Sequence, residues 1–174
     1  MLDKGIEEAI NDQINYELYS AYIYYAMQSW FLEKTMNGMA TWMSVQVKEE
    51  MSHAQIFYNY VVERGGRVLL KGIEGPMNDF DSPLHVYRTA LEHEQKVTAR
   101  INRIMDLAIE IKDHATVQFL QWFVAEQVEE ESAAAEIAGK LEWAQEAPAA
   151  LYQIDNELGT RVFTLPSPLA TTQA

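Results

Sequence analysis

The chain has 174 residues and an apolar share of 48%, which is enough for one continuous core, so we expect a single domain over residues 1–174. Thirteen basic residues against 26 acidic ones give a formal net charge of -13, which argues against nucleic acid and membrane surfaces as partners and favours cations. The absence of cysteine excludes disulfides, thiolate zinc sites, rubredoxin-type iron centres and cysteine nucleophiles.

The first third of the chain predicts a helical hairpin. Asp3 is a suitable N-cap, and apolar residues follow it at helical spacing to about residue 34. Asn37-Gly38 marks the predicted turn, after which the helical spacing resumes and continues to the Gly65-Gly66 stop. Because the joint between the two helices is short, we expect them to be antiparallel.

The next segment, from Gly65 to Asp81, is rich in turn-forming residues and shows no long helical period, which predicts a long connection. Its reach of about 56 Å, at about 3.3 Å per residue, exceeds the length of a helix of about 27 residues. The connection can therefore leave the helices on either side of it parallel. Ser82-Pro83 then begins a third helix, to about residue 111, and Asp113 begins a fourth, to about residue 143.

These elements predict an all-α fold, a four-helix bundle over about residues 4–143 with one long crossover between the second and third helices. Pro148 breaks the helical pattern, and a short fifth helix is predicted over about residues 149–160. Residues 165–174 are expected to form a frayed tail. The sequence shows no secretory leader and no stretch of about eighteen apolar residues, so we expect a soluble cytoplasmic protein.

Three polar residues of the first hairpin recur in the second when the chain is displaced by 77 positions. The two sets are Glu17, Glu50 and His53, and Glu94, Gln127 and Glu130. In both sets the first two residues are 33 positions apart, and the third residue follows three positions later. Two hairpins of equal geometry would bring these side chains together across a pseudo-twofold axis.

Four glutamates of these sets lie on apolar helical stripes near the middle of their helices. They are Glu17, Glu50, Glu94 and Glu130. We therefore expect the four carboxylates to point into the core and to converge there. Buried anions without a counter-charge are strongly unfavourable, and no lysine or arginine occupies a matching core position. Cations or protons must neutralise them.

The spacing of the polar residues predicts a two-metal site. Glu50 and His53 lie at positions i and i+3, so both can bind one metal ion. Glu17 and Glu94 can cap two ions on opposite sides, with Glu50 between them as a bridge. Oxygen-rich ligands with one imidazole favour iron or manganese over a closed structural zinc site. Incomplete coordination would leave room for oxygen or peroxide.

In these residues the chain resembles the non-haem bacterial ferritins, within the ferritin-like di-iron proteins, whose pattern is a glutamate from each of two helices and Glu-x-x-His from the others. The resemblance covers about residues 2–157. It is strongest in three segments, Asn15 to Ser20, Glu49 to His53 and Phe119 to Glu131.

This resemblance implies a ferroxidase centre in a ferritin-like bundle, with two iron ions bound at each centre. Glu17, Glu50 and His53 would hold the first iron. Glu50, Glu94 and Glu130 would hold the second iron. The resemblance thus places ligands from both repeated sets in one centre, and Glu50 would bind both iron ions.

The resemblance also implies roles for residues around the centre. Gln127 matches the glutamine that supports the centre through hydrogen bonds, and Tyr24 matches the adjacent tyrosine. Trp122 is close enough in the sequence to take part in redox chemistry. A third, neighbouring iron site would be formed by four glutamates, Glu49, Glu126, Glu129 and Glu130.

The chain departs from two better-known ferritin patterns. The second Glu-x-x-His of bacterioferritins is here Gln127 to Glu130, so a permanently metallated, symmetric centre is not expected. Two channel carboxylates of animal heavy-chain ferritins are replaced by Val117 and Leu120, which argues against an acidic threefold entry route. Met51 occupies the haem-ligand position of bacterioferritins, but we expect it to pack at an interface and expect no haem.

The function that the resemblance implies is iron storage and detoxification. The chain would oxidise Fe(II) to Fe(III) with dioxygen or peroxide and store the product as a ferric mineral in a hollow cage. That cage would be a homo-oligomer of twenty-four subunits with 432 symmetry, with the short fifth helix at the fourfold axes. Two alternatives stay open, a di-iron or di-manganese peroxidase without mineral storage and a metal buffer without catalysis.

Overall fold

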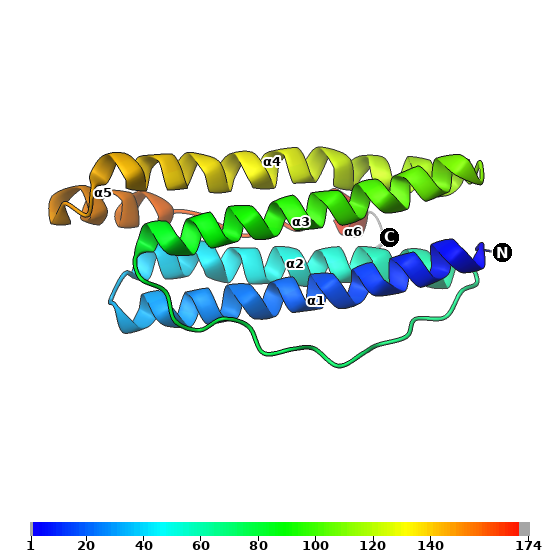
Figure 1. Ribbon diagram of the computed structural model, residues 1–174, viewed down its shortest axis with the longest axis horizontal. Coiled ribbons are helices and arrows are strands. Elements are labelled where there is room, and N and C mark those ends of the chain that lie inside the picture. Colours follow the sequence, from blue (N-terminus) through cyan, green and yellow to red (C-terminus); the bar gives the residue numbers. More distant parts are fainter. Residues whose placement is uncertain (1, 171–174) are drawn as a thin grey trace.

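The structure is a computed structural model, and it describes residues 2–170, which form a bundle of helices (Figure 1). The helices are α1 (Lys4–Glu33), α2 (Asn37–Glu63), α3 (Pro83–Glu110), α4 (His114–Ala144), α5 (Pro148–Leu158) and α6 (Ser167–Ala170). No strand occurs within residues 2–170. The predicted all-α class and the four-helix bundle are confirmed. Among the described residues, no helix combines the length and apolarity that a membrane span requires.

The long connection between α2 and α3 determines the topology. Residues 64–82 run along the outside of the bundle and return the chain to the end at which α2 began (Figure 1). As a result, α1 and α2 are antiparallel, α3 and α4 are antiparallel, and α2 and α3 are parallel. This is the single-crossover arrangement that the reach of the connection predicted.

Two asparagines of α1 hold the connection against the bundle. Asn11 donates to the carbonyl of Arg67 at 3.0 Å and accepts from the backbone N–H of Leu69 at 2.6 Å. Asn15 donates to the carbonyl of Leu69 at 3.0 Å and accepts from the N–H of Lys71 at 2.7 Å. The two amides thus provide backbone partners that the non-helical segment cannot supply itself.

The predicted helix caps are present. Asp3 Oδ1 accepts from the backbone N–H two residues later at 2.8 Å, at the start of α1. Ser82 accepts from the N–H three residues later at 3.1 Å, with Pro83 in the first turn of α3, and Asp113 does the same for α4 at 3.2 Å. Each cap satisfies a backbone donor that has no partner within its helix.

The prediction of a turn at Asn37-Gly38 is wrong, because both residues lie in the first turn of α2. The turn occurs earlier, where Thr35 has a φ of 59°. Gly38 packs against α5, and a Cβ on it would lie 1.6 Å from the carbonyl oxygen of Asp155. The Asp155 carboxylate also accepts from the N–H of Met39 at 2.8 Å, so α5 caps α2. Glycine is required here by close packing and not by a turn.

We expect Gly38→Ala to lower the free energy of unfolding by about 2 kcal/mol or more, because the backbones of α2 and α5 must separate. Denaturant unfolding monitored by circular dichroism measures the change. Gly139→Ala is the matched control, because a Cβ at Gly139 in α4 meets nothing within 4 Å. That control should be neutral or stabilising, since alanine is the better helix former. Equal stability of both variants would contradict the close contact.

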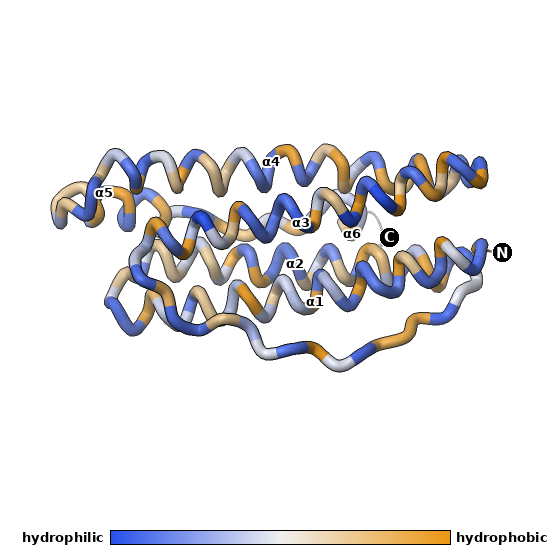
Figure 2. Tube along the Cα trace, viewed as in Figure 1, coloured by the Kyte–Doolittle hydropathy of each residue, from blue (hydrophilic) through white to orange (hydrophobic). Residues whose placement is uncertain are grey.

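The apolar core is divided into two clusters along the bundle. One cluster includes residues of α5 and lies at that end, and the other includes Leu2 and lies near the N-terminus. Within α1, the second cluster ends at Ile14 and the first begins at Ala21, while Glu17 and Ser20 are buried between them. Figure 2 shows hydrophobic and hydrophilic residues interspersed along every helix of the bundle. The interior therefore contains a polar layer in its middle.

The C-terminal part follows the prediction closely up to the tail. The fifth helix, predicted over about residues 149–160, is α5 at Pro148–Leu158. In the tail, residues 167–170 form the short helix α6, so the expectation of fraying is wrong for them. Residues 171–174 lie outside the described part of the chain.

Candidate metal centre

The polar layer contains side chains from each of α1 to α4. Its buried members are Gln13, Glu17 and Ser20 from α1, Gln46, Glu50 and His53 from α2, His93 and Glu94 from α3, and Gln127 and Glu130 from α4. The four glutamates are exposed by only 0–5%, as their apolar flanks predicted. Carboxylates at this depth need a proton or a cation as a partner.

Glu17, Glu50 and His53 form the first group of converging ligand atoms. One atom from each lies within 4.8 Å of the other two, and His53 Nδ1 is 3.6 Å from Glu50 Oε2. One oxygen each of Glu17 and Glu50 is buried without a hydrogen-bond partner. Because buried polar atoms are nearly always paired, these two oxygens are candidates for cation binding. The arrangement fits the first iron of the sequence prediction.

The other oxygen of Glu17 is held by a second layer of hydrogen bonds that the sequence reasoning missed. Gln13 Nε2 donates to Glu17 Oε1 at 2.8 Å. Arg100 Nε donates to Gln13 Oε1 at 3.0 Å and so fixes which end of the amide faces Glu17. The signal was available, because Gln13 lies four positions before Glu17 on the same helical face.

A second group lies on the other side of the His53 ring. Ligand atoms of His53, Glu126 and Glu130 lie within 4.8 Å of one another, and His53 Nε2 is 3.9 Å from Glu126 Oε1. Glu130 Oε2 accepts from Gln46 Nε2 at 2.9 Å. The imidazole of His53 thus stands between two carboxylate groups, with Trp122 packed against it at 5.6 Å between ring centroids.

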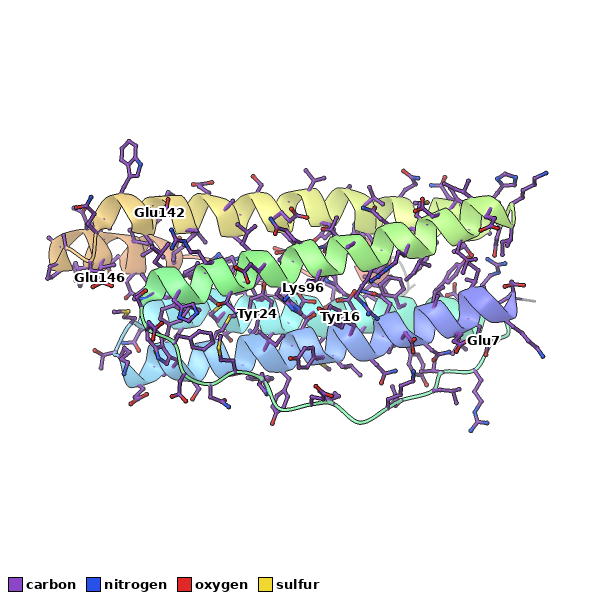
Figure 3. The ribbon with its side chains drawn as sticks, in the orientation of Figure 1. Glu7, Tyr16, Tyr24, Lys96, Glu142 and Glu146 are labelled. Carbon is purple, nitrogen blue, oxygen red and sulfur yellow. The ribbon has the colours of Figure 1, made fainter. Side chains whose placement is uncertain are left out.

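Glu94 joins neither group among the described residues, and neutral donors hold its two oxygens. Tyr24 donates its hydroxyl proton to Glu94 Oε1 at 2.5 Å, and Gln127 Nε2 donates to Glu94 Oε2 at 3.1 Å. Figure 3 shows Tyr24 inside the bundle, between α1 and α3. Both residues that the resemblance placed beside the centre therefore contact the same carboxylate.

Two carboxylates of the polar layer, Glu50 and Glu94, have raised pKa values when no metal ion is bound. Burial raises the pKa of Glu50 well above 4.5, and the neighbouring charges of Glu94 and Glu17 raise it further. Burial and the charge of Glu130 raise the pKa of Glu94 to about 8, against the hydrogen bonds from Tyr24 and Gln127. Metal ions would replace these protons, because a cation neutralises the same charges.

The predicted third-site glutamates, here called the acidic cluster, are Glu49, Glu126, Glu129 and Glu130. Glu130 is buried, Glu49 and Glu126 are half-buried, and Glu129 is exposed. Burial raises the pKa of Glu49 to about 7, even though Arg161 opposes the shift. Among the described residues, Glu49 and Glu129 are not part of either group of converging ligand atoms.

His93 is a further buried residue for which the sequence offered no partner pattern. Its Nε2 is 2.7 Å from Ser20 Oγ, and its ring stacks on Tyr16 with 5.3 Å between centroids. Burial and the charge of Lys96 lower its pKa to about 4, so the ring is neutral at physiological pH. His93 therefore carries no charge that could neutralise the nearby carboxylates.

The fold and the site define the class of this protein: a single-crossover four-helix bundle that buries carboxylates and histidine at its centre, where groups of them could hold a metal ion. Met51, which follows Glu50 in the chain, lies half exposed on α2.

Comparisons with known proteins give the family. A model of the ferritin-like domain matches residues 7–144. A bacterial non-heme ferritin of Staphylococcus aureus is 39% identical over 163 residues, 94% of this chain and 98% of that protein. A probable bacterial non-heme ferritin-like protein of Haemophilus influenzae is 36% identical over 159 residues, 91% of this chain and 96% of that protein. The chain belongs to the ferritin family.

Solved structures agree with this assignment. An open pore ferritin from the archaeon Archaeoglobus fulgidus is 45% identical, covers 93% of this chain and all of its own, and superposes with a TM-score of 0.92. A closed form of the same ferritin, engineered by mutagenesis, is 46% identical, covers 94% of this chain and all of its own, and has a TM-score of 0.93. The ferritin family is associated with iron storage and with ferroxidase activity.

Proposed function

We propose that this chain is a ferroxidase that oxidises Fe(II) to Fe(III) with dioxygen or peroxide and stores the product as a ferric mineral. The observation that supports it most is the convergence of buried ligand atoms of Glu17, Glu50 and His53, in which one oxygen of each glutamate lacks a hydrogen-bond partner. Membership of the ferritin family supports iron as the metal. Iron is here the substrate and the stored cargo.

In this proposal, two Fe(II) ions bind side by side in the polar layer. Glu17, Glu50 and His53 bind the first, and Glu50, Glu94 and Glu130 bind the second. The carboxylates act mainly through their charge, because anionic oxygen ligands stabilise Fe(III) more than Fe(II). The same charge lowers the reduction potential of the iron and so favours loss of an electron.

The reaction balances with two electrons. Each Fe(II) gives one electron, and dioxygen takes up both electrons and two protons to leave as hydrogen peroxide. When peroxide is the oxidant, the same two electrons break its O–O bond, and two protons complete two water molecules. Glu94 can release a proton when iron binds, because its pKa is about 8 without metal. Tyr24 and Gln127 keep Glu94 positioned throughout by their hydrogen bonds.

We also propose that the chains assemble into a hollow cytoplasmic cage of 24 subunits with 432 symmetry. The structural neighbours support assembly, since their names describe ferritins with an open pore and in a closed form. Native mass spectrometry and electron microscopy measure the mass and symmetry of this assembly. A mass near 24 times 19.9 kDa is expected.

Stopped-flow oxidation tests the proposed activity. Aerobic addition of two Fe(II) per subunit should produce diferric absorbance much faster than in buffer, and further additions should give a mineral inside the cage. A peroxidase without storage would consume peroxide but leave a small oligomer without mineral. Absorbance that rises no faster than in buffer would contradict a ferroxidase and favour a metal buffer.

Glu130→Ala is expected to weaken binding of the second Fe(II) by about tenfold or more, and binding of the first by much less. The reason is that the first group of ligand atoms, with Glu17 and Glu50, does not contain Glu130. Anaerobic Fe(II) titration by calorimetry separates the two affinities. Glu136→Ala is the matched control, since Glu136 is an exposed glutamate on the same helix. Equal loss at both ions would contradict the assignment.

A further inference from the structure

An arginine from the C-terminal segment enters the acidic cluster. Arg161 lies three residues beyond the end of α5, and its Nη2 is 2.7 Å from Glu49 Oε2. The two side chains are only 25% and 16% exposed, respectively. Their contact joins residues 112 positions apart, so it depends on the fold and not on neighbouring sequence.

The backbone holds this arginine in place. The N–H of Arg161 donates to the carbonyl of Leu158 at 3.3 Å, which continues the turn at the end of α5. That turn packs closely on α2, because a Cβ on Gly159 would lie 3.2 Å from the Cα of Gly38. The guanidinium carbon also lies 4.5 Å from the ring centroid of Trp42. Arg161 is therefore held in position by these contacts and is not a freely moving surface side chain.

Arg161 acts on a second member of the acidic cluster through an amide. Its Nη1 donates to Gln46 Oε1, which leaves the amide nitrogen of Gln46 facing Glu130. Gln46 Nε2 then donates to Glu130 Oε2 at 2.9 Å. The arginine therefore occupies one oxygen of Glu49 directly and directs a donor to one oxygen of Glu130.

Arg161 and Gln46 each occupy one oxygen of a carboxylate that the third ion would bind in this proposal. Within residues 2–170, Arg161 is the sole lysine or arginine that forms an ion pair with the acidic cluster. A guanidinium that pairs with a carboxylate already neutralises its charge, and its own positive charge repels a cation that approaches the same group. Binding of a cation and the Arg161 contact therefore compete.

We propose that Arg161 is the built-in counter-ion of the third iron site, and that a cation binds there only by displacing the guanidinium from Glu49 and Gln46. This inference rests on the proposed function, because it takes the acidic cluster as a site for iron. Its consequence is a third ion that binds more weakly than the first two. Occupancy of this site also becomes coupled to release of the C-terminal segment from α2.

Calorimetric titration with Zn(II), a redox-inert probe, tests this inference on the assembled protein. Arg161→Ala should tighten the third Zn(II) by about tenfold, the effect expected when a partly buried ion pair no longer competes, and should change the first two ions by less than about twofold. Arg161→Lys keeps the charge and should stay close to wild type. Arg103→Ala is the matched control, because Arg103 is an exposed arginine on α3 away from the cluster.

Crystal structures of the same variants show where the ion with the increased affinity binds. At a Zn(II) concentration that leaves the acidic cluster of the wild type empty, anomalous density should appear beside Glu49 in Arg161→Ala. Adding Glu129→Gln to that variant should remove the gain, since it deletes one ligand charge without touching Arg161. Density elsewhere, with none in the cluster, would overturn the inference.

A structural role alone would give a different result. If Arg161 only anchors the C-terminal segment, Arg161→Ala lowers stability and leaves the third Zn(II) affinity unchanged or weaker, which contradicts the inference. Arg161→Gln covers the case in which the alanine variant does not fold, because its amide can still donate to Gln46. If the proposed function itself is wrong, the wild-type protein will not bind two ions tightly and will oxidise Fe(II) no faster than buffer.

Discussion

Glu50→Ala is expected to slow Fe(II) oxidation by about a hundredfold or more, because the lost carboxylate is the proposed bridge between both ions. Glu50 belongs to the first converging group, and one of its oxygens has no hydrogen-bond partner. Its removal takes one ligand from each iron and one negative charge from the polar layer. The initial rate of diferric absorbance after mixing with dioxygen measures the effect.

Glu63→Ala provides the control for this loss, since Glu63 is an exposed glutamate at the end of the same helix. It removes an equal charge from α2 without entering the polar layer and should oxidise Fe(II) at the wild-type rate. His53→Ala should resemble Glu50→Ala, because it removes the one imidazole of the first group. A Glu50→Ala variant that keeps the wild-type rate would show that oxidation takes place elsewhere.

The metal-free protein is expected to become less stable as the pH rises from about 5 to about 8. The pKa of Glu94 is raised from 4.5 to about 8 by burial and by Glu130, and that of Glu50 is raised in the same direction. Below pH 4.5 the folded and unfolded chains both hold the Glu94 proton. Above it the unfolded chain releases the proton first, so the free energy of unfolding falls until the pH passes the folded pKa. One such group changes stability by about 3 to 4 kcal/mol over this window.

Denaturant unfolding of the chelator-treated protein at several pH values measures this trend. Saturation with Zn(II) should remove the trend, because metal ions bind the deprotonated carboxylates and stabilise the folded chain as the pH rises. Glu94→Gln should reduce the trend in the metal-free protein, since an amide has no proton to release in this range. A metal-free protein whose stability increases from pH 5 to pH 8 would contradict the raised pKa values.

The sequence was sufficient for the bundle and for the burial of the repeated polar residues inside it. Helical spacing, the caps at Asp3 and Ser82 and the length of the connection are properties of short segments, so they can be recognised without the fold. The repeat over 77 positions, with a spacing of 33 within each set, predicted equal heights in the two hairpins for Glu17, Glu50, Glu94 and Gln127, and the structure buries all four. Their roles as ligands and supports stay a prediction.

The remaining features depend on contacts between distant segments, which no local pattern reveals. The sequence suggested a turn at Gly38, but glycine is required there because the carbonyl of Asp155, in another helix, leaves no room for a side chain. Arg161 occurs in a segment without helical period, and only the packing of α5 on α2 brings it to Glu49. Gln46 was missed for the same reason, since its amide is oriented by Arg161.

Because the hydrophobic interior is divided into two clusters, we expect substitutions in one cluster to have little effect on the other. A substitution at Ile6 perturbs neighbours around the N-terminus, whereas one at Phe31 perturbs neighbours beside α5, and the two share no packing partner. Energetic effects at such separated places tend to be additive. Each apolar cluster can therefore accept substitutions independently of the other, while the side chains of the polar layer between them keep their positions.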